Sequence, residues 1–217
     1  MLLRRATENG AKGLLAIALM ASLLGPSDVA VGQGRFFDVT VTVVKDKIVA
    51  LPAGGSSIEE GLTLGETVVK TESKGQTGFA QTSSRLLAFS SELRRWADVA
   101  LGSDERVERH HVLPRSVVVQ SDRQLYGFQE GRAHWTNEPL GTGEKVKQLH
   151  GRGHVTVAIT TDRALAFSAF TGGFFSMPLS NDEAIVSVDG ANDAVLLRTS
   201  SRTIAFRSQT TDWTEIK

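Results

Sequence analysis

The chain contains no cysteine among its 217 residues. Without thiols it cannot form a disulfide framework, a thiolate nucleophile, a cysteine-ligated metal site or a lipid-modified cysteine anchor. An excess of charge of either sign is also missing, because 24 lysines and arginines balance 24 aspartates and glutamates. A neutral chain has no net field that steers it to polyanions. Nucleic acid and anionic membrane surfaces are therefore not expected as its main partners.

What the sequence does contain is a repeat of 39 residues. Two aromatic columns keep this spacing, and so do a leucine, a glutamate and a valine column. The aromatic columns are Phe89, Phe128, Phe167 and Phe206, and Trp96, Trp135, Phe174 and Trp213. The others are Leu62, Leu101, Leu140 and Leu179; Glu66, Glu105, Glu144 and Glu183; and Val68, Val107, Val146 and Ile185. A period of this length indicates a solenoid, a propeller or an array.

Each repeat reads as four short strands. In one repeat, residues 155–160, 164–168, 174–179 and 184–188 are β-branched or apolar, and polar turns separate them. Four antiparallel strands in about 39 residues are typical of a propeller blade. We predict an all-β chain, a five-bladed β-propeller of four-stranded blades over residues 33–217. Blades two to five are expected at 76–113, 115–152, 154–191 and 193–217, with the aromatic columns packed between blades.

Two segments resemble known propeller repeats. Ala205-Phe206 followed by Thr210-Thr211-Asp212-Trp213 resembles the end of a kelch-type repeat. Ala166-Phe167 with Thr171-Gly172 is similar to the quinoprotein-type repeat. The resemblance covers residues 35–217 at the level of strand order. It implies a propeller fold and a binding or scaffolding role like that of small bacterial propellers, and no functional residue carries over from it.

Residues 1–32 have the features of an export signal. Arg4, Arg5 and Lys12 precede an apolar run over residues 13–24. Pro26 follows the run, and residues 30–32 form a small-x-small cleavage site. The run is shorter than the ~20 residues of a membrane-spanning helix. We expect a periplasmic or secreted protein that loses this signal peptide. The alternative is an uncleaved N-terminal anchor that keeps the protein at the membrane.

The last repeat ends after its third expected strand, which leaves the last blade one strand short. Residues 28–31 match the segments at 66–69 and 144–147, allowing a slip of one residue. Propellers remove exposed strand edges by closing the ring. Residues 28–31 are therefore a candidate to complete the last blade. A mature chain that starts at Gln33 would exclude this arrangement.

One predicted end of the blades collects charged turn residues of both signs. Its basic members are Arg85, Arg123, Arg163 and Arg202, and they stand beside the glutamate column. Two interpretations stay open, a solvated rim of turn residues and a docking face for a partner.

The opposite end collects histidines. We take as its candidate ligand or partner face His111, Arg115, His134, His150 and His154. Fourth strands are expected about 15 Å outside first strands, three sheet spacings away. This places His111 and His150 tens of Å apart, so no shared metal is expected. Arg115 and His154 begin the expected inner strands and are the better candidates for contact with an anion or another ligand.

No pattern in the sequence predicts catalysis or a cofactor. A nucleophile elbow, a phosphate-cradling loop and a zinc-binding helix motif are all missing. Glycoside hydrolysis needs paired carboxyl groups, and the expected inner-strand segments 78–81, 117–120, 156–159 and 195–198 contain none. We expect a non-enzymatic, exported propeller that acts as a protein-binding scaffold or as an accessory subunit on the outer face of a membrane-embedded assembly. The alternative is a lectin-like propeller that binds glycans between blades.

Overall fold

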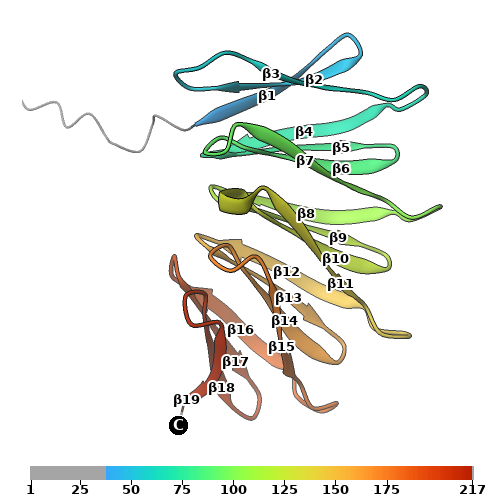
Figure 1. Cartoon of the computed structure of the whole chain (residues 1–217). Helices are drawn as coiled ribbons and strands as arrows, with labels where there is room; N and C mark the ends of the chain where they lie inside the picture. Colours follow the sequence, from blue (N-terminus) through green and yellow to red (C-terminus); the bar gives the residue numbers. More distant parts are fainter. Residues whose placement is uncertain (1–37, 217) are drawn as a thin grey trace, which may run out of the picture. The chain divides into compact units, whose positions relative to one another are not determined.

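The computed structural model describes residues 38–216, which form five antiparallel sheets (Figure 1). The first sheet has three strands, β1 (Val39–Val44), β2 (Lys47–Pro52) and β3 (Ile58–Gly61). The second has β4 (Val68–Lys74), β5 (Thr77–Thr82), β6 (Arg85–Ser90) and β7 (Arg95–Ala100). The third has β8 (Val107–Leu113), β9 (Ser116–Ser121), β10 (Gln124–Gln129) and β11 (His134–Pro139), with a short 3-10 helix η1 (Glu130–Arg132) before β11.

The fourth and fifth sheets repeat the four-stranded pattern. The fourth has β12 (Val146–Arg152), β13 (Val155–Thr160), β14 (Arg163–Ser168) and β15 (Phe174–Pro178). The fifth has β16 (Ile185–Gly190), β17 (Ala194–Thr199), β18 (Thr203–Arg207) and β19 (Asp212–Ile216). In every sheet each strand pairs antiparallel with the strand before and after it in the chain. The predicted all-β, propeller-like fold of five small sheets is confirmed, with the first sheet one strand short of the expected four.

Local turn chemistry explains where the hairpins form. Between the first and second strands of the second, third and fourth sheets the chain turns in two residues, and Gly75 and Gly153 take the positive φ angles of 54° and 56° that such turns require. Between the second and third strands a hydroxyl closes the turn. It donates to the backbone carbonyl three residues later at 3.0 Å in each four-stranded sheet, from Thr82, Ser121, Thr160 and Thr199.

The grouping of strands into blades differs from the prediction by one strand. The segment expected to end a blade, such as Val107–Leu113, pairs with the strand that follows it and therefore begins the next sheet. The sheets accordingly span 68–100, 107–139, 146–178 and 185–216, in place of the expected 76–113, 115–152, 154–191 and 193–217. The reason is the two-residue turn after this strand, which forms a hairpin, whereas a longer connection precedes the strand.

This regrouping also changes the expectation for the chain ends. The fifth sheet has all four strands, so the premise that the last sheet lacks one is wrong. The first sheet is the incomplete one. Residues 28–31 themselves lie outside the described part of the chain.

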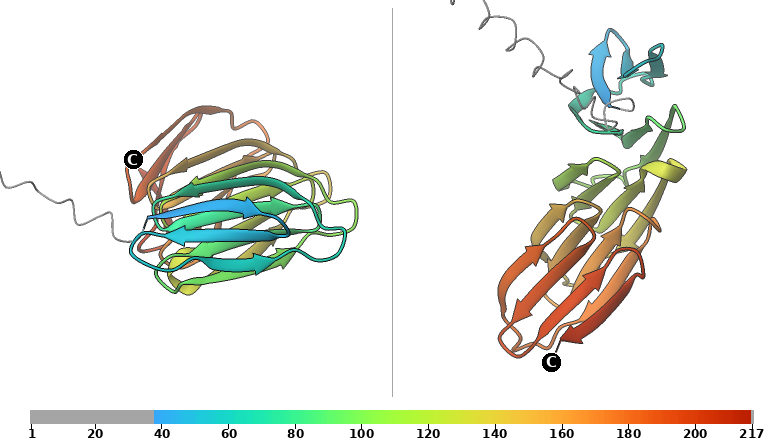
Figure 2. Two further views of the ribbon diagram at one scale, coloured as in Figure 1. Left: turned by 90° about the horizontal axis from the view of Figure 1, so that it is seen from above. Right: turned by 90° about the vertical axis from the view of Figure 1, so that its left-hand side faces the viewer.

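The core lies between the sheets, which pack in chain order (Figures 1 and 2). One hydrophobic cluster joins each consecutive pair, and no cluster within residues 38–216 joins the first sheet to the fifth. Phe89, Phe128, Phe167 and Phe206 of the third strands are fully buried, three of them in these clusters and Phe167 against Gly127 of the preceding sheet. The prediction that the aromatic columns are core residues is therefore confirmed.

The second aromatic column has a polar role that the spacing did not indicate. Each ring packs on the phenylalanine of the neighbouring strand, at 5.2 Å between centroids for Phe89 and Trp96. The indole of Trp135 also donates to the carbonyl of Ala97 in the preceding sheet at 3.0 Å, and Trp96 and Trp213 do the same at 3.2 and 3.0 Å. Phe174 occupies this place in the fourth sheet and has no N–H to donate.

Replacing Trp135 by phenylalanine tests this bond. The Trp135→Phe variant keeps an aromatic ring in the cluster but leaves the carbonyl of Ala97 without its donor. We expect the free energy of unfolding to fall by about 1–2 kcal/mol, measured by urea denaturation followed by circular dichroism. The control is Phe174→Leu, which removes no hydrogen bond. An unchanged Trp135→Phe midpoint would contradict the assignment.

Candidate functional site

The charged end of the sheets is a series of internal ion pairs, each of which we call a latch. A latch joins the arginine that begins the third strand of a sheet to the glutamate of the preceding connection. Arg85 and Glu66 are 2.8 Å apart, Arg163 and Glu144 2.9 Å, and Arg202 and Glu183 2.8 Å. The three glutamate side chains are only 1%, 3% and 2% exposed. Three of the four predicted rim arginines are thus committed to bonds within the chain.

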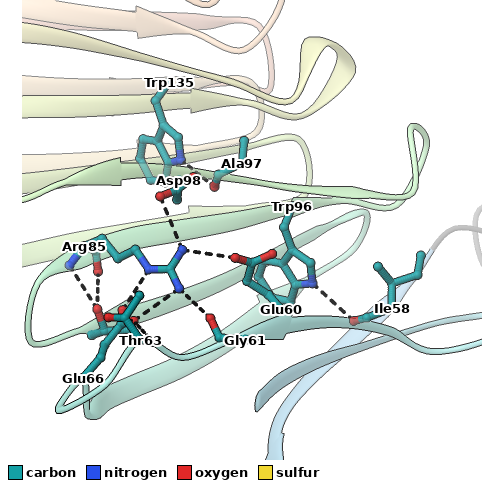
Figure 3. A network of polar contacts seen from close by, with 11 residues as sticks. Ile58, Glu60, Gly61, Thr63, Glu66, Arg85, Trp96, Ala97, Asp98 and Trp135 are labelled. Carbon is teal, nitrogen blue, oxygen red and sulfur yellow. Dashed lines mark hydrogen bonds and ion pairs between the residues drawn. The ribbon is translucent and has the colours of Figure 1, made fainter. Parts of the chain in front are cut away.

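Each latch also holds two sheets together, as Figure 3 shows for Arg85. Besides Glu66, the Arg85 guanidinium donates to the carbonyl of Gly61 in the first sheet at 2.7 Å and lies 3.1 Å from Glu60. Arg163 and Arg202 donate in the same way to the carbonyls of Pro139 and Pro178. The latch residues therefore stabilise the contacts between sheets.

The electrostatics of the latch follow from this geometry. Burial alone would raise the pKa of Glu66, but hydrogen bonds from Arg85, Thr82 and Thr63 outweigh it and hold the pKa at about 2. Hydrogen bonding by Arg202 is the largest influence on Glu183 and lowers its pKa to about 2 as well. Both glutamates are therefore charged throughout the physiological pH range.

The third sheet has no arginine–glutamate latch, and the predicted arginine column does not continue through it. The position 39 residues after Arg85 is Gln124, so Arg123 is not the counterpart of the latch arginines. Tyr126 replaces the leucine found at Leu87 and Leu165, and its hydroxyl donates to Glu105 at 2.9 Å. The Gln124 amide donates to the tyrosine oxygen at 2.6 Å. Burial and the Glu105 carboxylate raise the pKa of Tyr126 to about 12, so the phenol keeps the proton that it donates.

The first strands of neighbouring sheets lie side by side and form what we call the edge-strand face, made of β4, β8, β12 and β16. β8 contacts β4 on one side and β12 on the other. His110 of β8 lies 3.0 Å from Glu72 of β4, and Arg109 donates to the carbonyl of Lys147 of β12 at 3.1 Å. Polar side chains of both signs therefore run across several sheets on one surface.

Two predicted site residues, His111 and His150, meet on this face. Both line a groove of about 280 Å³ together with Arg152, Val188 and Asp189. His111 Nε2 lies 3.0 Å from the carbonyl of Leu149, next to His150 in the chain. The expectation that they are tens of Å apart is wrong, because β8 and β12 are first strands that adjoin and not distant outer strands. Groups of three or more metal-ligating side chains are absent from residues 38–216.

Glycines open this groove. Gly151 and Gly190 stand at the place that Val112 fills in the third sheet. A Cβ at Gly151 would lie 3.1 Å from His111, so a larger residue would crowd the ring. Burial and the nearby His111 lower the pKa of His150, which is consequently neutral near pH 7. Arg152 and Asp189 are then the charged groups of the groove.

The other predicted site residues lie elsewhere. His154 is bonded to Asp193 at 2.5 Å, and its ring packs against Phe170 at 4.7 Å. Arg115 lies 3.2 Å from Glu92 and 3.6 Å from the fully buried Glu130. His134 is exposed at the start of β11. The structure thus brings together His111 and His150 and separates them from the other three.

A second hollow, of about 600 Å³, lies between the third and fourth sheets. Gln120 of β9 lines it and is 1% exposed. Its amide nitrogen donates to Glu108, but its amide oxygen has no partner among the described residues. Ile159 holds the equivalent position in the fourth sheet and packs in an apolar cluster. A buried acceptor without a partner costs about 1–3 kcal/mol. No pattern in the sequence indicates this one.

Comparisons with known proteins give no family. Neither a family model nor a curated protein matches the sequence. Among solved structures, the chain is similar to HIRA(644–1017), at 13% identity over 83% of this chain and 55% of that one, with a TM-score of 0.40. It is also similar to Prp20p from Saccharomyces cerevisiae (11%, 78% and 55%, TM-score 0.41) and to BamB from Moraxella catarrhalis (12%, 82% and 59%, TM-score 0.37). The chain spans a little over half the length of these structures.

Acid unfolding tests the latch. A carboxyl with a lowered pKa stabilises the fold fully above its unfolded value of 4.5, and the contribution is lost as the pH falls toward the folded value of about 2. Arg202→Met removes the largest cause of the low Glu183 pKa. We expect its free energy of unfolding at pH 7 to drop by about 2 kcal/mol, and its acid-unfolding midpoint to move to higher pH.

The matched control is Arg198→Met, which removes an exposed arginine of the same sheet. Urea unfolding at a series of pH values measures both variants. Protonation of Glu183 removes the ion pair but leaves the Arg202 bond to the Pro178 carbonyl. The difference between Arg202→Met and the unmodified chain should therefore shrink as the pH falls from 4.5 toward 2. A difference that stays constant with pH would show that charge is not what the latch supplies.

Proposed function

We propose that the chain is a non-catalytic propeller module that binds a protein partner through its edge-strand face. The observation that carries the proposal is the groove between β8, β12 and β16, where His111, His150, Arg152 and Asp189 converge from three sheets. Propeller folds commonly serve protein binding, although a fold alone does not define a function. The groove supplies a concave, polar surface for such a contact, because Gly151 and Gly190 have no side chains to fill it.

The chemistry of the groove favours an extended peptide segment with both charges. The Arg152 guanidinium can hold a carboxylate bidentately, and Asp189 can accept from an ammonium or a backbone N–H. Gly151 and Gly190 let a partner backbone approach the strands closely. Charged latches at the end of the sheets are saturated by their own partners, which leaves the edge-strand face as the more available surface.

We further propose that the partner is part of a membrane-embedded assembly, with this chain as an accessory subunit on its outer face. The support is the basic and apolar N-terminal sequence, which has the features of an export signal or anchor. Within residues 38–216 the structure contains no helix that is long and apolar enough to cross a membrane.

Affinity capture tests this function. The intact tagged chain is used to capture proteins from its own native membranes solubilised in mild detergent. Arg152→Glu reverses the charge of the groove and should reduce the captured partner about tenfold or more. Arg198→Glu, an equal charge reversal at an exposed position of the fifth sheet, should leave capture unchanged. Equal capture by both variants would remove the groove from the contact, and failure to capture any protein would contradict the function.

A second candidate function, carbohydrate binding, is favoured by one observation, the unpartnered oxygen of Gln120. The hollow beside it also has Glu108, Asp122, Arg123 and Lys145 in its wall, a mixture of donors and acceptors that suits sugar hydroxyls. The first aromatic column cannot contribute stacking, because Phe89, Phe128, Phe167 and Phe206 are fully buried.

A glycan array tests this candidate with a matched pair of variants. If a sugar hydroxyl occupies the hollow, the intact chain binds a glycan and Gln120→Leu loses the signal. Gln81→Leu, the same change at the equivalent position of the second sheet, retains it. A Gln120→Leu chain that is folded and binds the array like the unmodified one would remove this hollow as the glycan site. No signal from any variant would exclude the carbohydrate function.

A further inference from the structure

The groove lies beside a strand edge that differs from its counterpart one sheet earlier. β12 and β16 are the first strands of the fourth and fifth sheets, and each is hydrogen-bonded to a strand on one side only. Their registers repeat with the period of the sequence, because Leu149 faces Ala158 and Val188 faces Leu197. The outward backbone groups of the two strands can therefore be compared position by position.

Side chains of the third sheet cover the edge of β12. Arg109 donates to the carbonyl of Lys147 at 3.1 Å, and His111 Nε2 lies 3.0 Å from the carbonyl of Leu149. Both carbonyls therefore point away from β13 and toward β8, which lies against β12. The chain itself closes this edge.

The edge of β16 has no such cover. The side chains one period later, Gln148 and His150, bond to each other instead, at 2.8 Å between Oε1 and Nε2. The carbonyls that they would cover belong to Val186 and Val188. Neither carbonyl accepts a side-chain bond from the described part of the chain. β12 also contacts β16 less extensively than it contacts β8, and the groove lies between the two strands.

β16 has the features of an edge that accepts another strand. Val186 is 62% exposed, and the strand contains neither lysine nor proline, which usually protect such edges. The N–H and C=O groups of one residue point to the same side in an antiparallel pair. Val188 and Gly190 therefore direct both groups away from β17, and Gly190 has no side chain that would obstruct a neighbour.

We propose that a partner protein binds by adding an extended segment as a new strand to the free edge of β16. The inference rests on the proposed function and specifies how the groove holds its partner. The new strand bonds to the backbone of Val188 and Gly190, which follow the β-bulge of β16. Main-chain bonds of this kind supply affinity, and the alternating side chains of the added strand supply specificity.

The charges on the two faces of β16 define the added segment. Arg152 lies on the groove side, where a Cβ at Gly190 would be 3.8 Å from its Cδ. Val188 packs toward the fourth sheet, so the side chains of Ser187 and Asp189, which are 3.1 Å apart, share the other face. The segment therefore presents an acidic side chain toward Arg152 and, at the next position, a basic side chain toward Asp189.

Peptide selection tests strand addition. A phage-displayed library of random linear peptides is selected on the full chain, and fluorescence anisotropy measures the affinity of the selected peptides. Val188→Pro removes an outward N–H that β17 does not use, a change that an edge position tolerates. We expect it to weaken peptide binding about tenfold. The control is Thr71→Pro, the same change at the equivalent position of β4, which should leave the affinity unchanged.

Amide hydrogen exchange of the unmodified chain, followed by NMR, gives a second readout that does not depend on a proline variant. Saturating peptide should slow exchange at the N–H groups of Val188 and Gly190 about tenfold or more and leave that of Thr71 unchanged. Exchange that stays fast at both edge residues in the complex would overturn the proposal. Protection that appears without peptide and rises with chain concentration would place a second copy on the edge and would overturn it as well.

The outcomes separate this inference from the proposed function. Peptides that lose affinity for Arg152→Glu but bind Val188→Pro as tightly as the unmodified chain would leave the groove as the binding site and exclude strand addition. A library that yields no binder would also count against strand addition. The proposed function fails on a different result, namely that the intact chain captures no protein from its membranes.

Discussion

A sheet of four short strands has two apolar faces and can bury them only against other sheets. This constraint governs the whole described chain. Each pair of consecutive sheets is joined by a hydrophobic cluster. Three of these four junctions also have an indole bonded to the preceding sheet, and three have an arginine–glutamate latch. At the opposite end hydroxyl and amide groups add further bonds, such as Ser90 to Glu130 and Ser168 to the carbonyl of Ser208. The edge-strand face is a result of this stacking, because it aligns the first strands.

The repeats differ most in the third and fourth sheets, and both candidate sites lie beside these differences. Gln124 and Tyr126 replace the latch arginine and a leucine, and the phenol takes over the bond to the glutamate. Phe174 replaces the indole, and Gln120 stands where the next sheet has Ile159. Glycine replaces Val112 at Gly151. Residues that depart from the repeat in these ways no longer serve packing alone, which is why we place function there.

The period predicted the number of sheets and the buried aromatics, because a repeated apolar residue has to be buried in every repeat. It could not predict which strand begins a sheet, since a period has no starting point and only the turn lengths around Gly75 and Gly153 decide it. The error in the separation of His111 and His150 followed from this. Arg123 was chosen by residue type, although counting from Arg85 leads to Gln124. The sequence does not indicate that the Gln120 oxygen is buried without a partner, because this depends on how two sheets pack together.

The bonds between sheets reach only from one sheet to the next, so the chain behaves like a row of coupled units whose strength is set junction by junction. The junction of the third and fourth sheets has the smallest buried cluster, no indole bond and a hollow of about 600 Å³ beside it. This junction depends more on polar bonds, namely the Arg163 latch and the bonds from Gln129 and Thr136 to the carbonyls of Phe170 and Gly172. Conditions that weaken ion pairs and hydrogen bonds are therefore expected to loosen this junction before the junctions that have larger apolar clusters.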